Sequence, residues 1–236
     1  NIRSAADKII WGKTVNAGQT CVAPDYVMVH ESIKNELIKE MKRSINDFYG
    51  DDVKGSESLG RIINERHFNR LRNILESDKE GLIYGGEYDE EEKYIAPSII
   101  QVKDWNAACM KEEIFAPILP IMEYSDLNEV VNAINKQPKP LALYLFTSDK
   151  RVEKKVLNEI SSGGVSINDT ILHLANSNLP FGGVGNAGMG AYHGEESFRT
   201  FSHRKSVLKK SRVLNTTLMY PPYSDKKLMV IKRFLK

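Results

Sequence analysis

The sequence has only two cysteines, no long apolar run and no excess of charge of either sign. Two cysteines, Cys21 and Cys109, cannot build a disulfide framework, so we expect a reducing, cytoplasmic setting. No stretch approaches the roughly 18 apolar residues that a membrane helix needs, and we expect no transmembrane segment. The 33 Lys and Arg residues nearly balance the 31 Asp and Glu residues, giving a net charge of +2. Such a balance gives no reason to expect a nucleic-acid partner.

The start of the sequence also lacks an initiator methionine. Its first 13 residues already carry apolar side chains at helical spacing, so the chain begins inside an expected helix. We therefore expect a fragment of a longer polypeptide.

What the sequence does contain is an alternation of short apolar segments with amphipathic ones. The expected strands are residues 25–30, 97–102, 118–124, 141–146 and 164–168, and the expected helices are residues 1–13, 33–48, 64–77, 126–136 and 149–160. Because strands that alternate with helices form βαβ units, we predict an α/β fold with a mostly parallel twisted sheet flanked by helices. The segment 141–146 is apolar throughout, as expected of a buried parallel strand.

Beyond residue 168 the alternation gives way to a glycine-rich loop, residues 178–194. Within it Gly183, Gly185 and Gly188 match the G-x-G-x-x-G pattern of dinucleotide-binding turns. That pattern works only between a strand and a helix N-terminus, and here a proline-containing loop precedes it and further glycines follow it. We therefore predict a tight loop in which glycines allow positive φ or close backbone approach. Residues 202–210 are then predicted to form an edge strand, and residues 225–236 a short amphipathic helix.

The two cysteines have different surroundings. Cys109 lies among apolar neighbours, as expected of a small buried hydrophobic residue. Cys21 lies in a polar loop between a helix and a strand, a place typical of catalytic side chains. A thiolate there could attack a carbonyl carbon while nearby backbone N–H groups hold the oxyanion. Composition leaves packing and nucleophilic roles for Cys21 open, since no pattern marks any of the five histidines as a partner base, and no metal site is predicted.

Five segments carry long motifs in a fixed order. They are N-A-G-Q-T-C-V-A-P-D at residues 16–25, K-E-E-I-F at 111–115, L-P-F-G-G-V-G at 179–185, G-M-G-A-Y-H-G at 188–194 and Y-P-P-Y-S-D-K-K at 220–227. Together they resemble the aldehyde dehydrogenase superfamily: the first is similar to its active-site segment, the second to its E-E-I-F-G-P segment and the third to its P-F-G-G loop. The last two resemble the class 3 branch, and the resemblance covers nearly the whole chain.

The resemblance implies roles for three residues. Cys21 would be the nucleophile, and its backbone N–H would form half of the oxyanion hole. Glu113 would accept hydrogen bonds from the nicotinamide-ribose hydroxyls of NAD or NADP, and Phe115 would pack near the nicotinamide. Cys21 would add to an aldehyde to give a thiohemiacetal, which is oxidised to a thioester and then hydrolysed to a carboxylic acid. Without the resemblance, Glu113 would be an ordinary solvated charge and Phe115 a core residue.

The chain departs from the family pattern at two positions and lacks one region. Ala116 stands where the family usually has Gly, and Ala187 stands where Ser is common. A methyl group at Ala116 could tighten the approach to the cofactor or merely stiffen the loop. In the family, a dinucleotide-binding domain precedes the nucleophile and supplies the general-base glutamate. We therefore expect that the chain alone does not turn over aldehydes.

The resemblance also implies a division of the chain and a homo-oligomer, a dimer or larger. Residues 1–197 would form the catalytic domain, and residues 198–236 would form an oligomerisation strand and a basic tail. The same edge could equally be a solvated strand that lysines protect from pairing. Two other functions stay open at this point: a thiol esterase that uses Cys21 without a nicotinamide, and a non-catalytic assembly domain.

Overall fold

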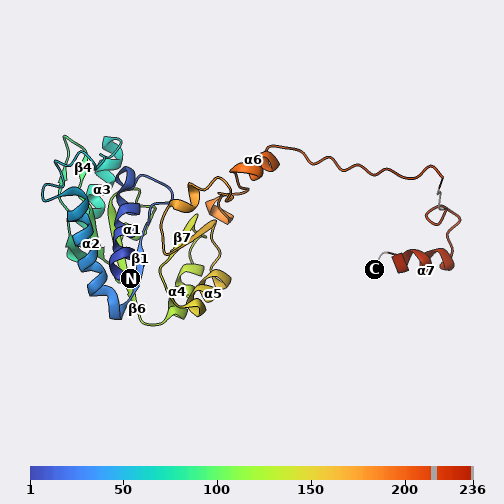
Figure 1. The fold of residues 1–236 in the computed structure, drawn as a ribbon, viewed down its shortest axis with the longest axis horizontal. Helices are drawn as coiled ribbons and strands as arrows, with labels where there is room; N and C mark the ends of the chain where they lie inside the picture. The colour runs from blue at the N-terminus through green and yellow to red at the C-terminus, as the bar shows by residue number, and fades with distance from the viewer. Residues whose placement is uncertain (214–216, 235–236) are drawn as a thin grey trace. The chain divides into compact units, whose positions relative to one another are not determined.

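A computed structural model describes residues 1–213 and 217–234, and the chain divides into two compact units, residues 1–201 and 202–236. The strands are β1 (Val27–His30), β2 (Leu82–Tyr84), β3 (Tyr88–Asp89), β4 (Tyr94–Ile95), β5 (Ser98–Gln101), β6 (Ile118–Tyr124), β7 (Ala142–Leu145) and β8 (Gly164–Ile167). The α-helices are α1 (Ile2–Thr14), α2 (Lys34–Tyr49), α3 (Glu65–Ser77), α4 (Leu127–Asn135), α5 (Lys150–Glu159), α6 (Gly194–Thr200) and α7 (Asp225–Phe234) (Figure 1).

The largest sheet has four strands in the order β1-β6-β5-β2. β1, β6 and β5 are parallel to one another, and β2 lies antiparallel to β5 at one edge. Parallel neighbours cannot be joined by a tight turn, so the chain passes through helices before it returns to the sheet. The predicted α/β fold with a mostly parallel sheet is therefore confirmed.

Successive side chains of the central strands face two different layers of helices. Ile99 of β5 and Leu119 of β6 pack against α1 and α2, in a cluster that includes Met41. Ile100 of β5 points the other way and packs with Phe68 of α3. Because successive side chains of a strand point to opposite faces, a sheet covered on both faces needs apolar residues at every position. This double burial accounts for the unbroken apolar runs in the sequence.

Short polar side chains mark the first turns of the helices. Asn64 accepts a hydrogen bond from the backbone N–H of His67 at 2.9 Å, and Asp126 accepts one from that of Asn128 at 2.9 Å. Both predicted N-caps are confirmed. Each cap satisfies an N–H group that has no partner within its own helix, which fixes where the helix begins.

β7 and β8 pair in parallel as a separate two-stranded sheet. α4 and α5 cover it with a cluster that includes Val131, Val156 and Ile160. The prediction that this segment is a parallel strand is confirmed, but the prediction that it is buried is wrong, because all residues of Ala142–Leu145 are only half-buried. The reason is that β7 has a neighbouring strand on one side only, while its other edge faces a cavity.

The C-terminal unit contains α7, which agrees with the predicted amphipathic helix; residues 235–236 lie outside the described residues. Residues 202–210 contain neither helix nor strand. A strand exists only through pairing, so the predicted edge strand is not formed in this single chain, and its pairing with a partner subunit stays a prediction. Within the described residues, no helix is both long enough and apolar enough to span a bilayer.

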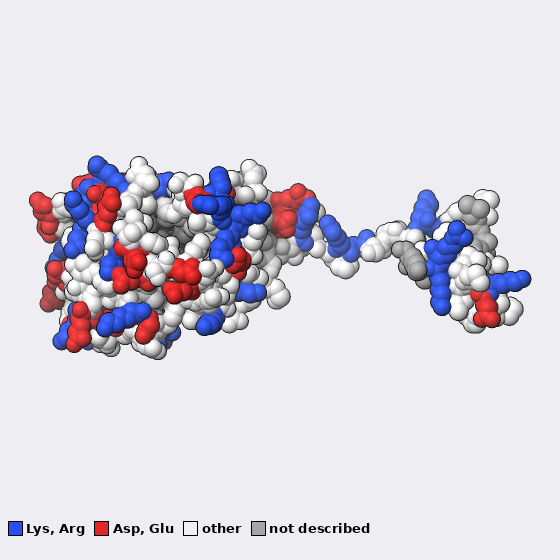
Figure 2. Space-filling model, turned by 90° about the horizontal axis from the view of Figure 1, so that it is seen from below, with Lys and Arg blue, Asp and Glu red and all other residues white. Residues whose placement is uncertain are grey.

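Charge is distributed unevenly between the two units. On the face shown in Figure 2, basic and acidic side chains are interspersed over the larger unit. Residues 202–236 carry ten Lys and Arg but only one acidic residue, Asp225. The near-neutral balance of the whole chain therefore combines a basic C-terminal unit with a net acidic remainder.

The core between α3 and the sheet generates a stability prediction. Phe68 is fully buried, so Phe68→Ala removes a large apolar side chain and leaves a cavity. We expect the free energy of unfolding to fall by about 3–5 kcal/mol in urea titrations followed by circular dichroism. Phe48→Ala on α2, where the ring is 38% exposed, is the matched control and should cost about 1 kcal/mol or less. Equal losses for the two variants would contradict this account of the core.

Candidate active site

Cys21 lies in a turn between α1 and β1 and borders a cavity of about 1340 Å³. The thiol is free and exposed, and in the part of the chain that the structure describes neither it nor the Cys21 backbone N–H has a hydrogen-bond partner. Asn16 and Ala17, which follow α1, adopt left-handed φ angles of 53° and 52°. These two residues turn the chain sharply and leave the cysteine at the surface of the cavity.

Side-chain hydrogen bonds hold this turn on both sides. The Gln19 side chain donates to the carbonyl oxygen of Arg61 at 3.0 Å and accepts from the backbone N–H of Ile63 at 2.9 Å. The Tyr144 hydroxyl, which comes from β7, donates to the carbonyl oxygen of Val22 at 2.6 Å. The backbone on each side of the cysteine is thus tied to a distant part of the chain.

Two further contacts lock the turn against the K-E-E-I-F segment. The Asp25 carboxylate accepts a hydrogen bond from the backbone N–H of Ile114 at 3.0 Å. Gly18, at a φ of 72°, passes so close to the carbonyl group of Ala116 that a Cβ atom there would overlap it. These contacts bring Glu113 and the cysteine turn together, although some ninety residues separate them in sequence.

Glu113 lines the same cavity as Cys21. Its side chain is exposed overall, but partial burial of the carboxyl group raises its pKa, and the nearby Asp25 carboxylate raises the pKa further. Lys13 and Arg70 act in the opposite direction. The cavity therefore presents a thiol and a carboxyl group that share one space, and the structure brings these two sequence-predicted residues together.

Phe115 is not among the residues that line this cavity. Its ring is 39% exposed, and its φ of 55° is uncommon for an aromatic residue. The neighbouring Ala116 is fully buried in a core cluster with Ala17, so its methyl group fills the core and does not narrow the cavity. Ala187 does line the cavity, with a methyl group where a hydroxyl was noted as common in the family.

Lys13 is a charged residue of the site that the sequence analysis missed. It lies near the end of α1 and is only 2% exposed. Burial lowers its pKa to about 8, while the carboxylates of Asp25 and Glu113 oppose this shift. A signal was present in the sequence, because Lys13 stands three and four residues after Ile10 and Ile9, on the apolar face of the helix.

His173 lies beneath Tyr144 and was not singled out by any sequence pattern. Its ring contacts those of Tyr144 and Phe181, with centroids 5.8 Å and 6.1 Å away. Neither ring nitrogen has a hydrogen-bond partner among the described residues, and burial lowers the pKa of the imidazole. His173 therefore supports the Tyr144 ring as a neutral aromatic group.

Cys109 is fully buried, which confirms its predicted role as a small core residue. Burial raises the pKa of its thiol, and the Asp78 carboxylate raises it further. A thiol that holds its proton so firmly is a poor nucleophile at neutral pH. Across residues 1–213 and 217–234, no group of three or more His, Cys, Asp or Glu side chains is placed to hold a metal ion.

The glycine-rich segment forms the predicted tight loop. Gly185 has a φ of 64°, and a Cβ atom on Gly183 would overlap the backbone of Ala187. Only a three-residue 3₁₀ turn, Gly185–Ala187, lies within the motif, so the segment lacks the α-helix N-terminus that a dinucleotide-binding turn needs. The G-x-G-x-x-G match is therefore a packing motif.

An exposed thiol in a rigid turn, facing a carboxyl group across one cavity of an α/β domain, defines the class of enzymes with a cysteine nucleophile. A model of the aldehyde dehydrogenase family matches residues 1–207. The chain belongs to this family.

Three relatives indicate the branch of the family. The chain is 48% identical over 236 residues to 4,4'-diaponeurosporen-aldehyde dehydrogenase of Staphylococcus aureus, covering 100% of the chain and 51% of the relative. It is 49% identical over 221 residues to the dimeric NADP-preferring aldehyde dehydrogenase of Rattus norvegicus, covering 92% of the chain and 48% of the relative. It is 47% identical over 233 residues to aldehyde dehydrogenase family 3 member A2 of Mus musculus, covering 98% of the chain and 48% of the relative. The predicted similarity to the class 3 branch is confirmed.

A solved structure agrees with these relatives. The substrate-bound state of Staphylococcus aureus AldH matches with a TM-score of 0.92 and 48% identity, covering 100% of this chain and 51% of that one. The chain thus spans about half the length of the curated relatives that it matches.

The contact between Gly18 and Ala116 generates a prediction with an internal control. Gly18 and Gly50 have nearly the same φ, 72° and 75°, but a Cβ atom on Gly50 would meet nothing within 4 Å. We expect Gly50→Ala to lower the free energy of unfolding by about 1 kcal/mol, the cost of a left-handed φ. Gly18→Ala should cost about 1–3 kcal/mol more because the backbone must shift. Urea unfolding measures both, and equal costs would show that the close approach is unimportant.

Burial of Lys13 generates a prediction about pH. Between about pH 8 and 10.5 the folded state has lost the Lys13 proton while the unfolded state retains it, so stability rises with pH. The free energy of unfolding, taken as the difference between the native chain and Lys13→Met, should rise by up to about 3 kcal/mol over this range. The exposed Lys39→Met on α2 controls for loss of an amine. A difference that stays flat or falls with pH would contradict the burial.

Proposed function

We propose that this chain is the cysteine-bearing part of an NAD(P)-dependent aldehyde dehydrogenase that oxidises aldehydes to carboxylic acids. The observation that carries the proposal is the convergence of the exposed Cys21 thiol and the Glu113 carboxyl group on one cavity. Membership of the aldehyde dehydrogenase family supports the same chemistry. Because the chain spans about half of its relatives, we assign the activity to a larger assembly that includes this chain.

In the proposed reaction the Cys21 thiolate adds to the aldehyde carbon, and the carbonyl electron pair moves to the oxygen. The unpartnered backbone N–H of Cys21 is a suitable donor to that oxyanion. Gln19 and Tyr144 hold the backbone of the turn, so the thiol needs no rearrangement before it reacts.

The residues present fit one part of a nicotinamide cofactor. The Glu113 carboxylate can accept hydrogen bonds from ribose hydroxyls beside the thiol, and the exposed Phe115 ring can pack near the nicotinamide. When bound, NAD or NADP accepts the hydride that leaves the carbon attached to Cys21. Cys21 then holds the acyl group as a thioester until water releases the acid. We propose that the base for this water belongs to the part of the enzyme that the chain does not cover.

We propose a homodimer or larger assembly for the whole enzyme, with residues 1–197 as the catalytic domain and residues 198–236 as the oligomerisation segment. The separation of residues 202–236 as a compact unit of its own supports this division. The name of the rat relative, which describes it as dimeric, agrees with the assembly. The reducing, cytoplasmic setting stays a prediction that the free state of Cys21 and Cys109 supports.

The first chemical step can be tested on the chain itself. With an aldehyde labelled with ¹³C at the carbonyl carbon, such as hexanal, we expect the native chain to give the ¹³C NMR signal of a hemithioacetal. Cys21→Ala should lose this signal, and Cys109→Ala should retain it because its thiol is buried. A signal that survives Cys21→Ala, or that depends on Cys109, would overturn the assignment of the nucleophile.

One measurement separates the proposal from a thiol esterase. Both enzymes form a thioester on cysteine, so ester cleavage does not distinguish them. Only a dehydrogenase forms NAD(P)H in proportion to the aldehyde consumed, which absorbance at the wavelength of the reduced nicotinamide records in the complete enzyme. Full activity of that enzyme with Cys21→Ala would instead favour a non-catalytic assembly role for the chain.

A further inference from the structure

β1 and β7 are both edge strands among the strands that the structure describes, and their free edges face the same cavity. β1 pairs only with β6, and β7 pairs only with β8. The cavity is lined by every residue of β1 and β7, but by no residue of β8. It therefore lies between the two sheets, along edges whose backbone groups have no strand partner.

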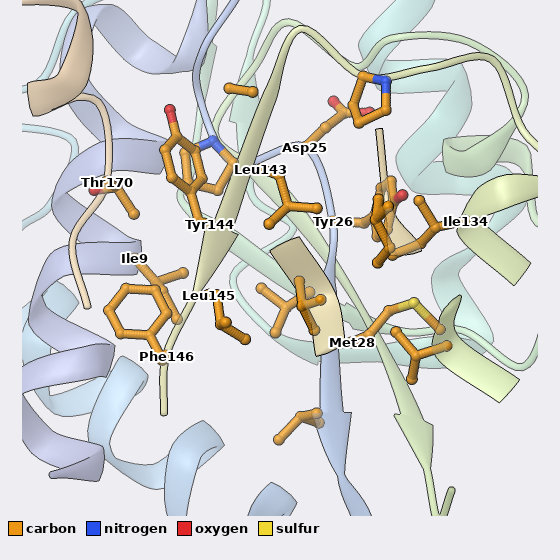
Figure 3. A pocket seen from close by; sticks show the side chains of 18 of the residues that line it. Ile9, Asp25, Tyr26, Met28, Ile134, Leu143, Tyr144, Leu145, Phe146 and Thr170 are labelled. Atoms are coloured by element: carbon orange, nitrogen blue, oxygen red, sulfur yellow. The ribbon is translucent and has the colours of Figure 1, made fainter. Parts of the chain in front are cut away.

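The two edges are matched in direction and in length. In Figure 3, Tyr26 and Met28 of β1 follow one another in the same direction as Leu143 and Leu145 of β7. Each strand has four residues, or roughly 13 Å of edge. One more strand between them could run parallel to both, and the two sheets would then become one sheet in which β1 and β7 flank the inserted strand.

The space between the edges, here called the slot, has apolar walls on both faces. Ile9 of α1 and Phe146 lie on one face, and Ile134 of α4 lies with Leu143 and Met28 on the other (Figure 3). A strand in this position would be covered by helices on both sides, as in other parallel sheets. The slot therefore favours a strand with apolar side chains on both faces.

Hydrogen bonds across the slot fix its walls. Lys8 of α1 donates from Nζ to the carbonyl oxygen of Asn168 at 2.5 Å, and its own carbonyl oxygen accepts from the Thr170 hydroxyl at 2.8 Å. The bond from Tyr144 to Val22 joins β7 to the start of β1. A slot whose walls are already tied together needs little reorganisation to bind a strand.

We propose that the slot between β1 and β7 binds one apolar β-strand, parallel to both, from the part of the polypeptide that the relatives have beyond the share covered by this chain. That part is about half of their length. Asn1 borders the same cavity, so a strand that leaves the slot can reach α1 through a short connection. Such a strand, α1 and β1 would together form a βαβ unit. Main-chain hydrogen bonds would supply affinity, and the apolar walls would supply specificity.

The charge of the chain argues against its own tail as the occupant. Residues 202–210 are the extended segment that a second copy could offer, and they carry four Lys and Arg in nine residues. Burying several unpaired charges between apolar walls is costly. The described strands of a second copy already have partners within their own sheets. This proposal concerns assembly and does not depend on the chemistry at Cys21.

Peptides test the proposal without requiring the other half to fold. Overlapping peptides of about 12 residues, tiling the part of Staphylococcus aureus AldH outside the matched share, are added to the native chain, and binding is measured by fluorescence anisotropy. We expect one contiguous apolar group of peptides to bind. In hydrogen exchange measured by mass spectrometry, backbone amides of both β1 and β7 should then exchange about tenfold more slowly or less.

Two matched variants and a self-association assay complete the test. Leu143→Lys places a charge in the slot and should weaken binding by about tenfold or more. Leu157→Lys lies outside the cavity on α5, where Leu157 is 44% exposed, and should change binding less than about twofold. The proposal fails if no peptide binds, if bound peptides protect other strands, or if sedimentation of the chain alone shows a dimer that protects β1 and β7. If circular dichroism shows Leu143→Lys to be unfolded, the exchange result on the native chain decides.

Discussion

The turn that carries Cys21 keeps its place because it packs against a segment almost a hundred residues further along the chain. Gly18 has no Cβ atom and can therefore pass directly against the carbonyl group of Ala116. The Asp25 carboxylate then satisfies the backbone N–H of Ile114, which would otherwise be left unpaired next to the core. The position of the thiol relative to Glu113 follows from this interface, and so does the interior into which the end of α1 inserts Lys13.

The same interface concentrates charge in a region of low solvent access. Lys13 is buried between carboxylates, which limits the fall in its pKa, and Lys13 in turn limits the rise in the pKa of Glu113. Each group makes the burial of the other less costly, and a buried amine without these carboxylates would be strongly disfavoured. The charge state of Glu113 therefore depends on a helix that does not itself line up with any family motif.

The sheet architecture is complete around β5 and β6 and open between β1 and β7. The opening explains why an apolar strand such as β7 is only half-buried, and why one cavity reaches from the Cys21 turn to the far ends of two strands. Tyr144 links the two regions, since it belongs to β7 and holds the carbonyl group of Val22 next to the cysteine. Occupation of the slot would also immobilise β7, and with it one of the bonds that hold the thiol.

The sequence by itself determined the element types, the caps at Asn64 and Asp126, the tight glycine loop and the family, because these rest on local periodicity, local hydrogen bonds and the order of motifs. It also identified Cys21 and Glu113, which stand inside motifs. Tertiary structure alone decided that Asp25 and Tyr144 hold the site, since their partners lie 89 and 122 residues away and no local pattern records such pairs. It also decided the burial of β7 and the absence of a strand at residues 202–210, because the burial and pairing of a strand depend on which neighbours are present at its edges.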